Sequence, residues 1–422
     1  MSFFEQRIMK QLGVWSKIAL VNLAVVALLG LTLRGLAVFP SAYLHFSHLL
    51  HAHSHFAFGG WVTLALMSLM VHVLLPQAQG SRKVYQGVLG GVLFSAFGML
   101  FTFAARGYAP ASIAFSTLLV LLSFVFTGVF WRDLRYAGLS RPVRVLAIGA
   151  LLSLAFSAVG PLGLAFMTAR KIGAAALQND AIYTYLHLQY NGFFTLAVGA
   201  LLLHRLKLQG AWPQRLAVAL TASTGPSLCA SFLWHDPAPA VWLVAAIGSV
   251  LLLGVLVALL GILRPALQAM AAWPVMARHM IQWAIGAFAL SVVMRIVVVV
   301  PAVGAWVFTG RPLIVGFLHL VLLGFVSAAI LSLYLEMGLL PVYRPGLHIW
   351  VAGIVVNELV LFSRPFTAAW CPAALYNGFL FIAAALLLTG TSLLAFTACF
   401  YRRLGCTGLR SSLFILKPSE HE

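Results

Sequence analysis

Acidic residues are scarce in this chain of 422 residues, which has only eight Asp and Glu against 26 Lys and Arg. Charged residues of both signs make up 8% of the sequence, whereas hydrophobic residues make up 62% and the mean hydropathy is +1.02. A water-soluble domain has roughly 25% charged residues, so this composition excludes that class. The chain is predicted to be an all-α, polytopic integral membrane protein whose first partner is the lipid bilayer.

Cysteines are also few, and several common motifs are missing. The four cysteines show no C-x-x-C spacing, which argues against a thiolate metal cluster. No phosphate-binding glycine loop and no nucleophile elbow is present. The formal charge of +18 is interpreted as a topology signal and as attraction to anionic lipid, and no nucleic-acid partner is expected.

Long apolar runs define about twelve candidate transmembrane helices, because backbone polar groups in lipid must be satisfied within each segment. The longest connections are expected around 132–144 and 264–278. The twelve segments lie at about 16–38, 49–76, 87–106, 111–131, 145–168, 181–205, 215–234, 241–263, 280–300, 312–336, 347–366 and 374–400.

The distribution of Lys and Arg predicts that both termini face the cytoplasm. With the N-terminus inside, 19 of the 26 basic residues fall on the inner side and 7 remain for the outer loops and the helices. We therefore expect one transmembrane domain over 1–422 in the inner (cytoplasmic) membrane of the cell, with 405–422 as a cytoplasmic tail.

Three histidines recur at a spacing of 132 residues, and each is followed five residues later by a glycine. The pairs are His55 and Gly60, His187 and Gly192, and His319 and Gly324. This period predicts a pseudo-threefold repeat of four helices, at approximately 1–140, 141–272 and 273–404. An imidazole in an apolar helix is costly without a partner, so the pattern favours a shared metal or haem around a common centre. The glycines would let a flat macrocycle or a neighbouring helix approach closely.

The second helix and the residues just before it contain the largest group of histidines in the chain. On a helix, His48, His51 and His55 share one face, whereas His53 and His55 are about 200° apart and point to opposite sides. The candidate cofactor and metal ligands are therefore His51, His53 and His55, with His187 and His319. Hydrogen-bonded ties between helices are the alternative role. His45 completes the group and, like His48, is expected in the outer loop.

These residues resemble two related groups of membrane proteins. The His53-Ser-His55 helix, with Gly60-Trp61 after it, resembles the His-x-His helix of haem–copper oxidase subunit I. His51-Ala-His53 and Leu318-His319, with Gly324-Phe325 after it, are similar to motifs of the NnrS-type haem- and copper-containing membrane proteins. The resemblance implies a twelve-helix fold, haem with copper as a second candidate cofactor, and a role in electron transfer or in nitric oxide and respiratory redox metabolism. A respiratory electron donor or oxidase subunits are the implied partners.

The sequence departs from the oxidase pattern at two places. The seventh helix lacks the His-His pair that would bind copper, and position 317 on the tenth helix is Phe317 rather than a second histidine. A complete oxygen-reducing centre is therefore not expected. The resemblance still implies one bis-histidine haem, held by His319 and by one histidine of the second helix, a ligation that suits electron transfer. His187 would hold a second metal or haem.

Two further interpretations follow from the polar residues. The outer histidines from His45 to His55 would suit a transition-metal permease that captures its cargo there, and this is the alternative function. Arg106, Arg295 or Arg311 would pair with haem propionates, because guanidinium groups bind planar carboxylates well. Alternatively, Arg295 would tie to Glu358 between helices.

Overall fold

The computed structural model describes residues 3–75 and 83–404. These residues form helices and short connections, with no strand among them. Twelve helices in the described ranges are long and apolar enough to cross a membrane, which confirms the predicted number. The all-α, polytopic class follows directly from the composition, because only helices satisfy the backbone of an apolar run in lipid.

Several of the spans combine more than one kind of helix. In chain order the elements are α1 (Phe3–Val38), α2 (Phe46–Phe56), η1 (Ala57–Thr63), α3 (Leu64–Leu69), η2 (Met70–Leu74), α5 (Lys83–Arg106), α6 (Pro110–Leu134), α7 (Arg141–Ser157), α8 (Val159–Ala169), α9 (Ala175–His187), η3 (Leu188–Phe194), α10 (Thr195–Arg205), α11 (Ala211–Leu228), η4 (Cys229–His235), α12 (Pro239–Met270), α13 (Val275–Val297), α14 (Pro301–Thr309), α15 (Arg311–His319), η5 (Leu320–Ser327), α16 (Ala328–Glu336), α17 (Arg344–Thr367) and α18 (Ala373–Leu404).

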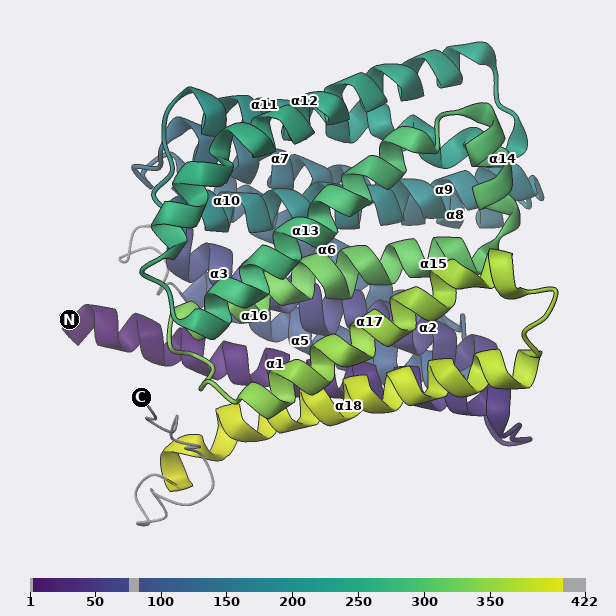
Figure 1. The fold of residues 1–422 in the computed structure, drawn as a ribbon, viewed down its shortest axis with the longest axis horizontal. Helices are drawn as coiled ribbons and strands as arrows, with labels where there is room; N and C mark the ends of the chain where they lie inside the picture. The colour runs from purple at the N-terminus through teal and green to yellow at the C-terminus, as the bar shows by residue number, and fades with distance from the viewer. Residues whose placement is uncertain (1–2, 76–82, 405–422) are drawn as a thin grey trace, which may run out of the picture.

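The helices run roughly side by side along the longest axis of the molecule (Figure 1). Consecutive helices form antiparallel neighbours, and the last helix, α18, packs against both α17 and the first helix, α1. The start of α1 and the end of α18 lie at the same end of the bundle (Figure 1). We call this end the terminal side, and the end that carries the α1–α2 and α9–α8 connections the far side.

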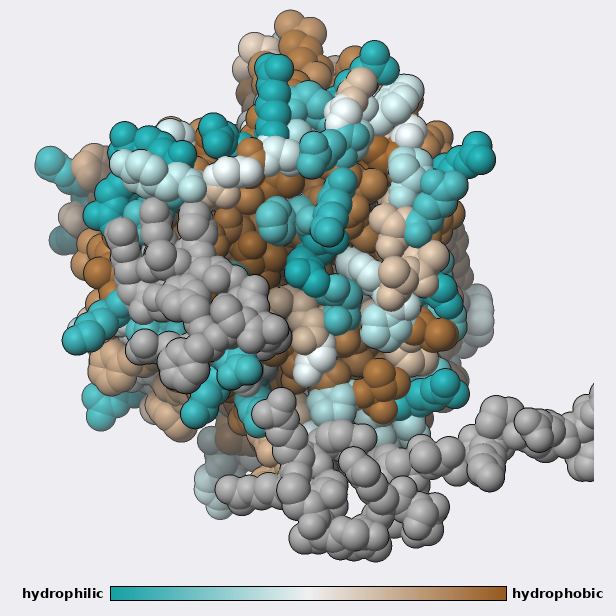
Figure 2. Space-filling view, turned by 90° about the vertical axis from the view of Figure 1, so that its left-hand side faces the viewer, coloured by the Kyte–Doolittle hydropathy of each residue, from teal (hydrophilic) through white to brown (hydrophobic). Residues whose placement is uncertain are grey.

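The terminal side is more polar than the helix walls. Figure 2 looks onto this end and shows hydrophilic residues gathered over it, with apolar residues between them and along the sides. The walls carry many exposed apolar side chains, such as Leu260 and Leu359. Such a surface fits a bundle with its long axis across a bilayer.

Three π-helical stretches occupy matched positions in the second, sixth and tenth spans. They are η1, η3 and η5, and each begins one or two residues after His55, His187 and His319 respectively. A π-helical turn inserts an extra residue and frees carbonyl groups from the regular ladder. Each of the three histidines at the 132-residue spacing is therefore followed by a π-helical stretch. The superposition of three whole four-helix repeats stays a prediction.

Side chains satisfy some of the carbonyls that these π-helical stretches present. Asn22 of α1 donates its amide Nδ2 to the carbonyl of Gly60 at 2.6 Å, and Thr195 donates its hydroxyl to the carbonyl of Tyr190 at 2.7 Å. The indole of Trp61 donates to the hydroxyl of Ser327 at 2.9 Å, which ties η1 to η5. In an apolar interior each such bond avoids the cost of a buried unpaired polar group.

The structure differs from the sequence-based boundaries in three places. The first helix starts at Phe3. Helix α12 continues through Pro265 to Met270, so the connection predicted at 264–278 is limited to the residues between Met270 and Val275. An extra short helix, α14, lies between the ninth and tenth spans. The predicted cytoplasmic tail, 405–422, lies outside the described residues.

Candidate functional site

His53 is held by the first helix. Its ring atom Nδ1 lies 3.1 Å from the backbone carbonyl oxygen of Val26 on α1, so the proton is on Nδ1 and is donated to that oxygen. Gly30 stands one turn further along α1, and a Cβ there would lie 3.4 Å from Cε1 of His53. A Cβ at Gly30 would make an ordinary van der Waals contact with the imidazole, so only a larger, branched side chain there would crowd the ring. This arrangement leaves Nε2 with its lone pair.

His319 is held in the same tautomer by its own helix. Its Nδ1 lies 2.8 Å from the carbonyl oxygen of Val315, one turn earlier on α15. His319 is the last residue of α15, directly before the π-helical η5, so the change of helix type occurs at the histidine. Metal-binding histidines are commonly oriented by such a hydrogen bond from the other ring nitrogen to a carbonyl.

His53 and His319 lie within electrostatic range of one another in the bundle interior. The Nε2 atom of neither ring has a hydrogen-bond partner among the described residues, and neither atom is completely covered by protein atoms. Two neutral imidazoles with fixed rings and available lone pairs are the donor set that a bis-histidine haem requires. These two residues fit that group.

A charged pair accompanies the two imidazoles. Arg34, on the α1 face beyond Gly30, is within electrostatic range of both His53 and His319 and also of Glu358 on α17. Glu358 is buried, accepts a hydrogen bond from Asn357 at 3.2 Å through Oε1, and has no partner for its covered Oε2. Glu358 is therefore within electrostatic range of Arg34 and makes no ion pair with Arg295, so the predicted tie between Glu358 and Arg295 is wrong.

His51 and His55 belong to a separate cluster on the opposite face of the second helix, as their spacing predicts. The ring of His55 stacks on Phe103 of α5 at 4.4 Å between centroids, and its Nε2 lies 3.4 Å from the hydroxyl of Tyr108. His51 meets the same Tyr108 edge to face at 4.7 Å. Tyr108 lies in the α5–α6 connection, and desolvation raises the pKa of its hydroxyl.

His187 has protein partners at both ring nitrogens. Its Nε2 donates to the carbonyl of Thr224 on α11 at 3.0 Å and lies 3.3 Å from the hydroxyl of Ser227. Its Nδ1 then accepts a bond from the amide Nδ2 of Asn191 at 3.2 Å. The ring is 1% exposed, so no lone pair is available without breaking a buried hydrogen bond. This geometry is that of a tie between the sixth and seventh spans.

The three histidines do not share a common centre. His55 contacts α5 and Tyr108, His187 contacts α11, and His319 lies by His53 and Arg34, so the predicted convergence of the repeated histidines is wrong. In the described part of the chain, no group of three or more His, Cys, Asp or Glu side chains is placed to hold a metal ion. His48 shares a face with His51 and His55, but the described side chains of the three are not grouped closely enough to hold a metal ion.

The three repeated glycines lie where helices or rings come close. A Cβ on Gly192 would lie 2.6 Å from Cβ of Ser153 on α7, and one on Gly324 would lie 3.3 Å from Cβ of Ala287 on α13. At Gly60 the close neighbour is the ring of Phe56, at 2.8 Å. The contacts of Gly192 and Gly324 support the alternative that these glycines allow neighbouring helices to approach.

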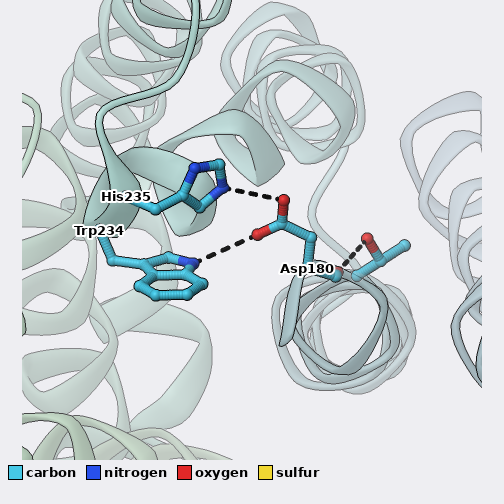
Figure 3. A network of polar contacts seen from close by, with 4 residues as sticks. Asp180, Trp234 and His235 are labelled. Carbon is cyan, nitrogen blue, oxygen red and sulfur yellow. Dashed lines mark hydrogen bonds and ion pairs between the residues drawn. The ribbon is translucent and has the colours of Figure 1, made fainter. Parts of the chain in front are cut away.

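A second polar network lies toward the far side, between the sixth and seventh spans. Asp180 of α9 accepts hydrogen bonds from the indole of Trp234 at 3.2 Å and from Nε2 of His235 at 2.9 Å (Figure 3). The same residue's carbonyl accepts the hydroxyl of Thr184. This network joins the end of η4 to α9. Each carboxylate oxygen of Asp180 accepts a hydrogen bond within it, so we interpret the network as a structural connection between the two spans.

Sequence reasoning did not identify Gly30 and Arg34. Their role depends on α1 lying beside the second span, and neither residue carries a motif that would have shown it. Arg106 and Arg311, which were candidates for propionate partners, are exposed. Arg34 is instead the cation beside the histidine pair.

No protein-family model and no curated protein matches the sequence. Among solved structures, the chain is similar to a heme–copper terminal oxidase determined as a dimer by cryo-EM, with a TM-score of 0.65 and 15% sequence identity. The match covers 98% of this chain and 85% of the oxidase chain. The resemblance to haem–copper oxidase subunit I is therefore confirmed for the fold. The closer resemblance to NnrS-type proteins stays a prediction.

Proposed function

We propose that this protein binds one haem between His53 and His319 and serves electron transfer in the membrane. One observation carries the proposal. In both imidazoles Nδ1 donates a hydrogen bond to a backbone carbonyl, and Nε2 has no hydrogen-bond partner among the described residues, so its lone pair can bind a metal. A bis-histidine haem would supply one-electron transfer without an open coordination position. The role in nitric oxide or respiratory redox metabolism that the NnrS resemblance implies is part of the same proposal.

The residues around the pair have distinct tasks in this proposal. The carbonyls of Val26 and Val315 fix the two rings and their tautomer, which raises the basicity of Nε2. Arg34 provides positive charge for the carboxylates that a haem carries, and Glu358 balances Arg34. The apolar walls exclude water, which strengthens each of these electrostatic interactions.

The same proposal assigns structural roles to the remaining candidate ligands. His187 ties two spans, and His51 and His55 pack with Tyr108. The location in an inner membrane, with both termini on the cytoplasmic side, stays part of the proposal and depends on the distribution of Lys and Arg. An electron donor is required, and its class is left to experiment.

The test is haem content in protein purified from haem-replete cells. A pyridine haemochrome assay is expected to give about one haem per chain, with a low-spin Soret spectrum in both oxidation states. Metal analysis of the same sample measures copper, the second candidate cofactor. A colourless protein that inserts and folds, and that takes up no haem when haem is added, would contradict the proposal.

A further inference from the structure

Arg295 is a buried cation that the histidine site does not use. It lies on α13, two residues before the far-side end of that helix, and only 8% of its surface is exposed. Its one hydrogen bond among the described residues is from Nε to the carbonyl of Ser291, and at 3.4 Å that bond is long. Four of the five N–H donors of the guanidinium therefore have no protein acceptor.

Four of the five described carboxylates have partners elsewhere in the bundle. Of the chain's eight acidic residues, five have side chains that the structure describes, and none of the five pairs with Arg295. The described contacts join Asp133 to Arg132, Asp180 to His235, Glu336 to Arg205 and Glu358 to Asn357, and Glu358 is also within electrostatic range of Arg34. A guanidinium buried in a membrane protein is costly without a counter-charge. None of the described carboxylates supplies that counter-charge to Arg295.

A second donor lies next to Arg295. Tyr190 of η3 is within electrostatic range of the guanidinium, is only 8% exposed, and its hydroxyl has no hydrogen-bond partner among the described residues. Neither this hydroxyl nor the terminal nitrogens of Arg295 are completely covered by protein atoms. Two donors without an acceptor thus lie within electrostatic range of one another, and the ring of Phe317 packs on Tyr190 at 5.9 Å between centroids.

We propose that Arg295 and Tyr190 form a binding site for a monovalent carboxylate. A planar carboxylate matches the fork of a guanidinium and leaves a lone pair for a phenol donor. One negative charge balances one positive charge, whereas a divalent oxyanion would leave an excess charge among apolar and aromatic groups. The carboxylate belongs either to a small free acid or to the head of a fatty acid, because the site lies near the far-side end of α13. The site does not depend on the haem proposal, since Arg295 is not among the groups that interact with His53 or His319.

The test uses the full chain purified in detergent. Thermal unfolding is followed while sodium formate or acetate replaces sodium chloride at constant ionic strength, with sulfate as a second oxyanion. In a parallel arm, acids that co-purify with the protein are extracted and identified by mass spectrometry. The variants are Arg295→Gln, Arg295→Lys, Tyr190→Phe and, as a matched control, Arg311→Gln, which changes an exposed arginine at the same end of the bundle.

A free acid as the ligand predicts a saturable rise of the unfolding temperature of the wild type and of Arg311→Gln. The rise should be lost in Arg295→Gln, and it should need about tenfold more anion in Arg295→Lys, which keeps the charge but not the fork. A fatty acid as the ligand predicts instead an acid that co-purifies at about one per chain with the wild type and not with Arg295→Gln. Either result supports the site.

Three results would overturn it. The first is a sulfate effect on the unfolding temperature equal to that of formate. The second is an anion effect or a co-purifying acid that Arg295→Gln retains. The third is the absence of both the anion effect and the co-purifying acid in the wild type. A folding defect in Arg295→Gln does not obstruct the test, because Arg295→Lys and Tyr190→Phe then report on the same ligand.

Discussion

At the scale of single residues, the partner of one ring nitrogen decides what each histidine can do. In His53 and His319 a carbonyl takes the Nδ1 proton and leaves Nε2 available, whereas in His187 a carbonyl takes the Nε2 proton and Asn191 occupies Nδ1. A spacing of 132 residues cannot distinguish these states, because the partners lie on other helices or on the preceding turn. The periodicity of the second helix did predict correctly that His53 and His55 face opposite ways.

Gly30 offers a direct test of how His53 is positioned. In Gly30→Val the branched side chain would occupy the space against Cε1 of His53 and displace the ring from the Val26 carbonyl. We expect a loss of at least half of the bound haem, measured by the pyridine haemochrome assay, with normal insertion. Gly13→Val on the same helix is the control, because a Cβ there meets nothing within 4 Å. Equal haem content in both variants would show that Gly30 does not set the ring position.

Tyr108 should give a pH dependence outside the membrane-spanning helices. Burial raises the pKa of its hydroxyl above the ordinary value of 10.0, so the folded state holds this proton more tightly than the unfolded state does. The resulting stabilisation is fully present below pH 10 and is lost as the pH rises through the pKa of the folded state. The difference between wild-type and Tyr108→Phe ultraviolet titrations should therefore show one phenol ionising above pH 10. Ionisation at or below pH 10 would contradict the described burial.

At the scale of elements, the π-helical stretches bring neighbouring helices close to the repeated glycines. Gly192→Ala would place a Cβ 2.6 Å from that of Ser153 and should destabilise the protein by about 1–3 kcal/mol through overpacking. Gly324→Ala meets Ala287 at 3.3 Å and should cost less than Gly192→Ala. Unfolding in mixed micelles measures both, and Ser153→Gly should restore stability to Gly192→Ala. A larger loss in Gly324→Ala than in Gly192→Ala would reverse this order.

The sequence predicted that the helices exist, but it did not predict which type of helix occurs within each span. Lipid permits only helices for apolar runs, so the number of spans followed from the number of such runs in the sequence. The π-helical stretches η1, η3 and η5 were not predicted, although the repeated pattern of histidine and glycine marks their positions. Their hydrogen bonds, such as that from Asn22 to Gly60, join residues far apart in the chain and depend on packing.

At the scale of the whole molecule, the orientation in the membrane is open to a simple measurement. The start of α1 and the end of α18 lie at one end of the bundle, and the excess of basic residues predicts that this end is cytoplasmic (Figure 1). A fluorescent protein fused at the C-terminus should therefore fluoresce, and a periplasmic reporter enzyme fused at the same point should be inactive. The same enzyme fused in the α5–α6 connection after Gly107 should be active. The opposite pattern would place the His53 and His319 end of the bundle on the inner side.

The measurement that tests the central claim most directly compares haem content and the Soret spectrum in four single variants. The account predicts that His53→Ala and His319→Ala each abolish the low-spin spectrum or lower haem content severely, because each removes one of two available Nε2 ligands. His55→Ala and His187→Ala should keep the wild-type spectrum, with lower stability for His187→Ala because it breaks buried hydrogen bonds. A His319→Ala protein with a wild-type Soret band and full haem stoichiometry would contradict the account.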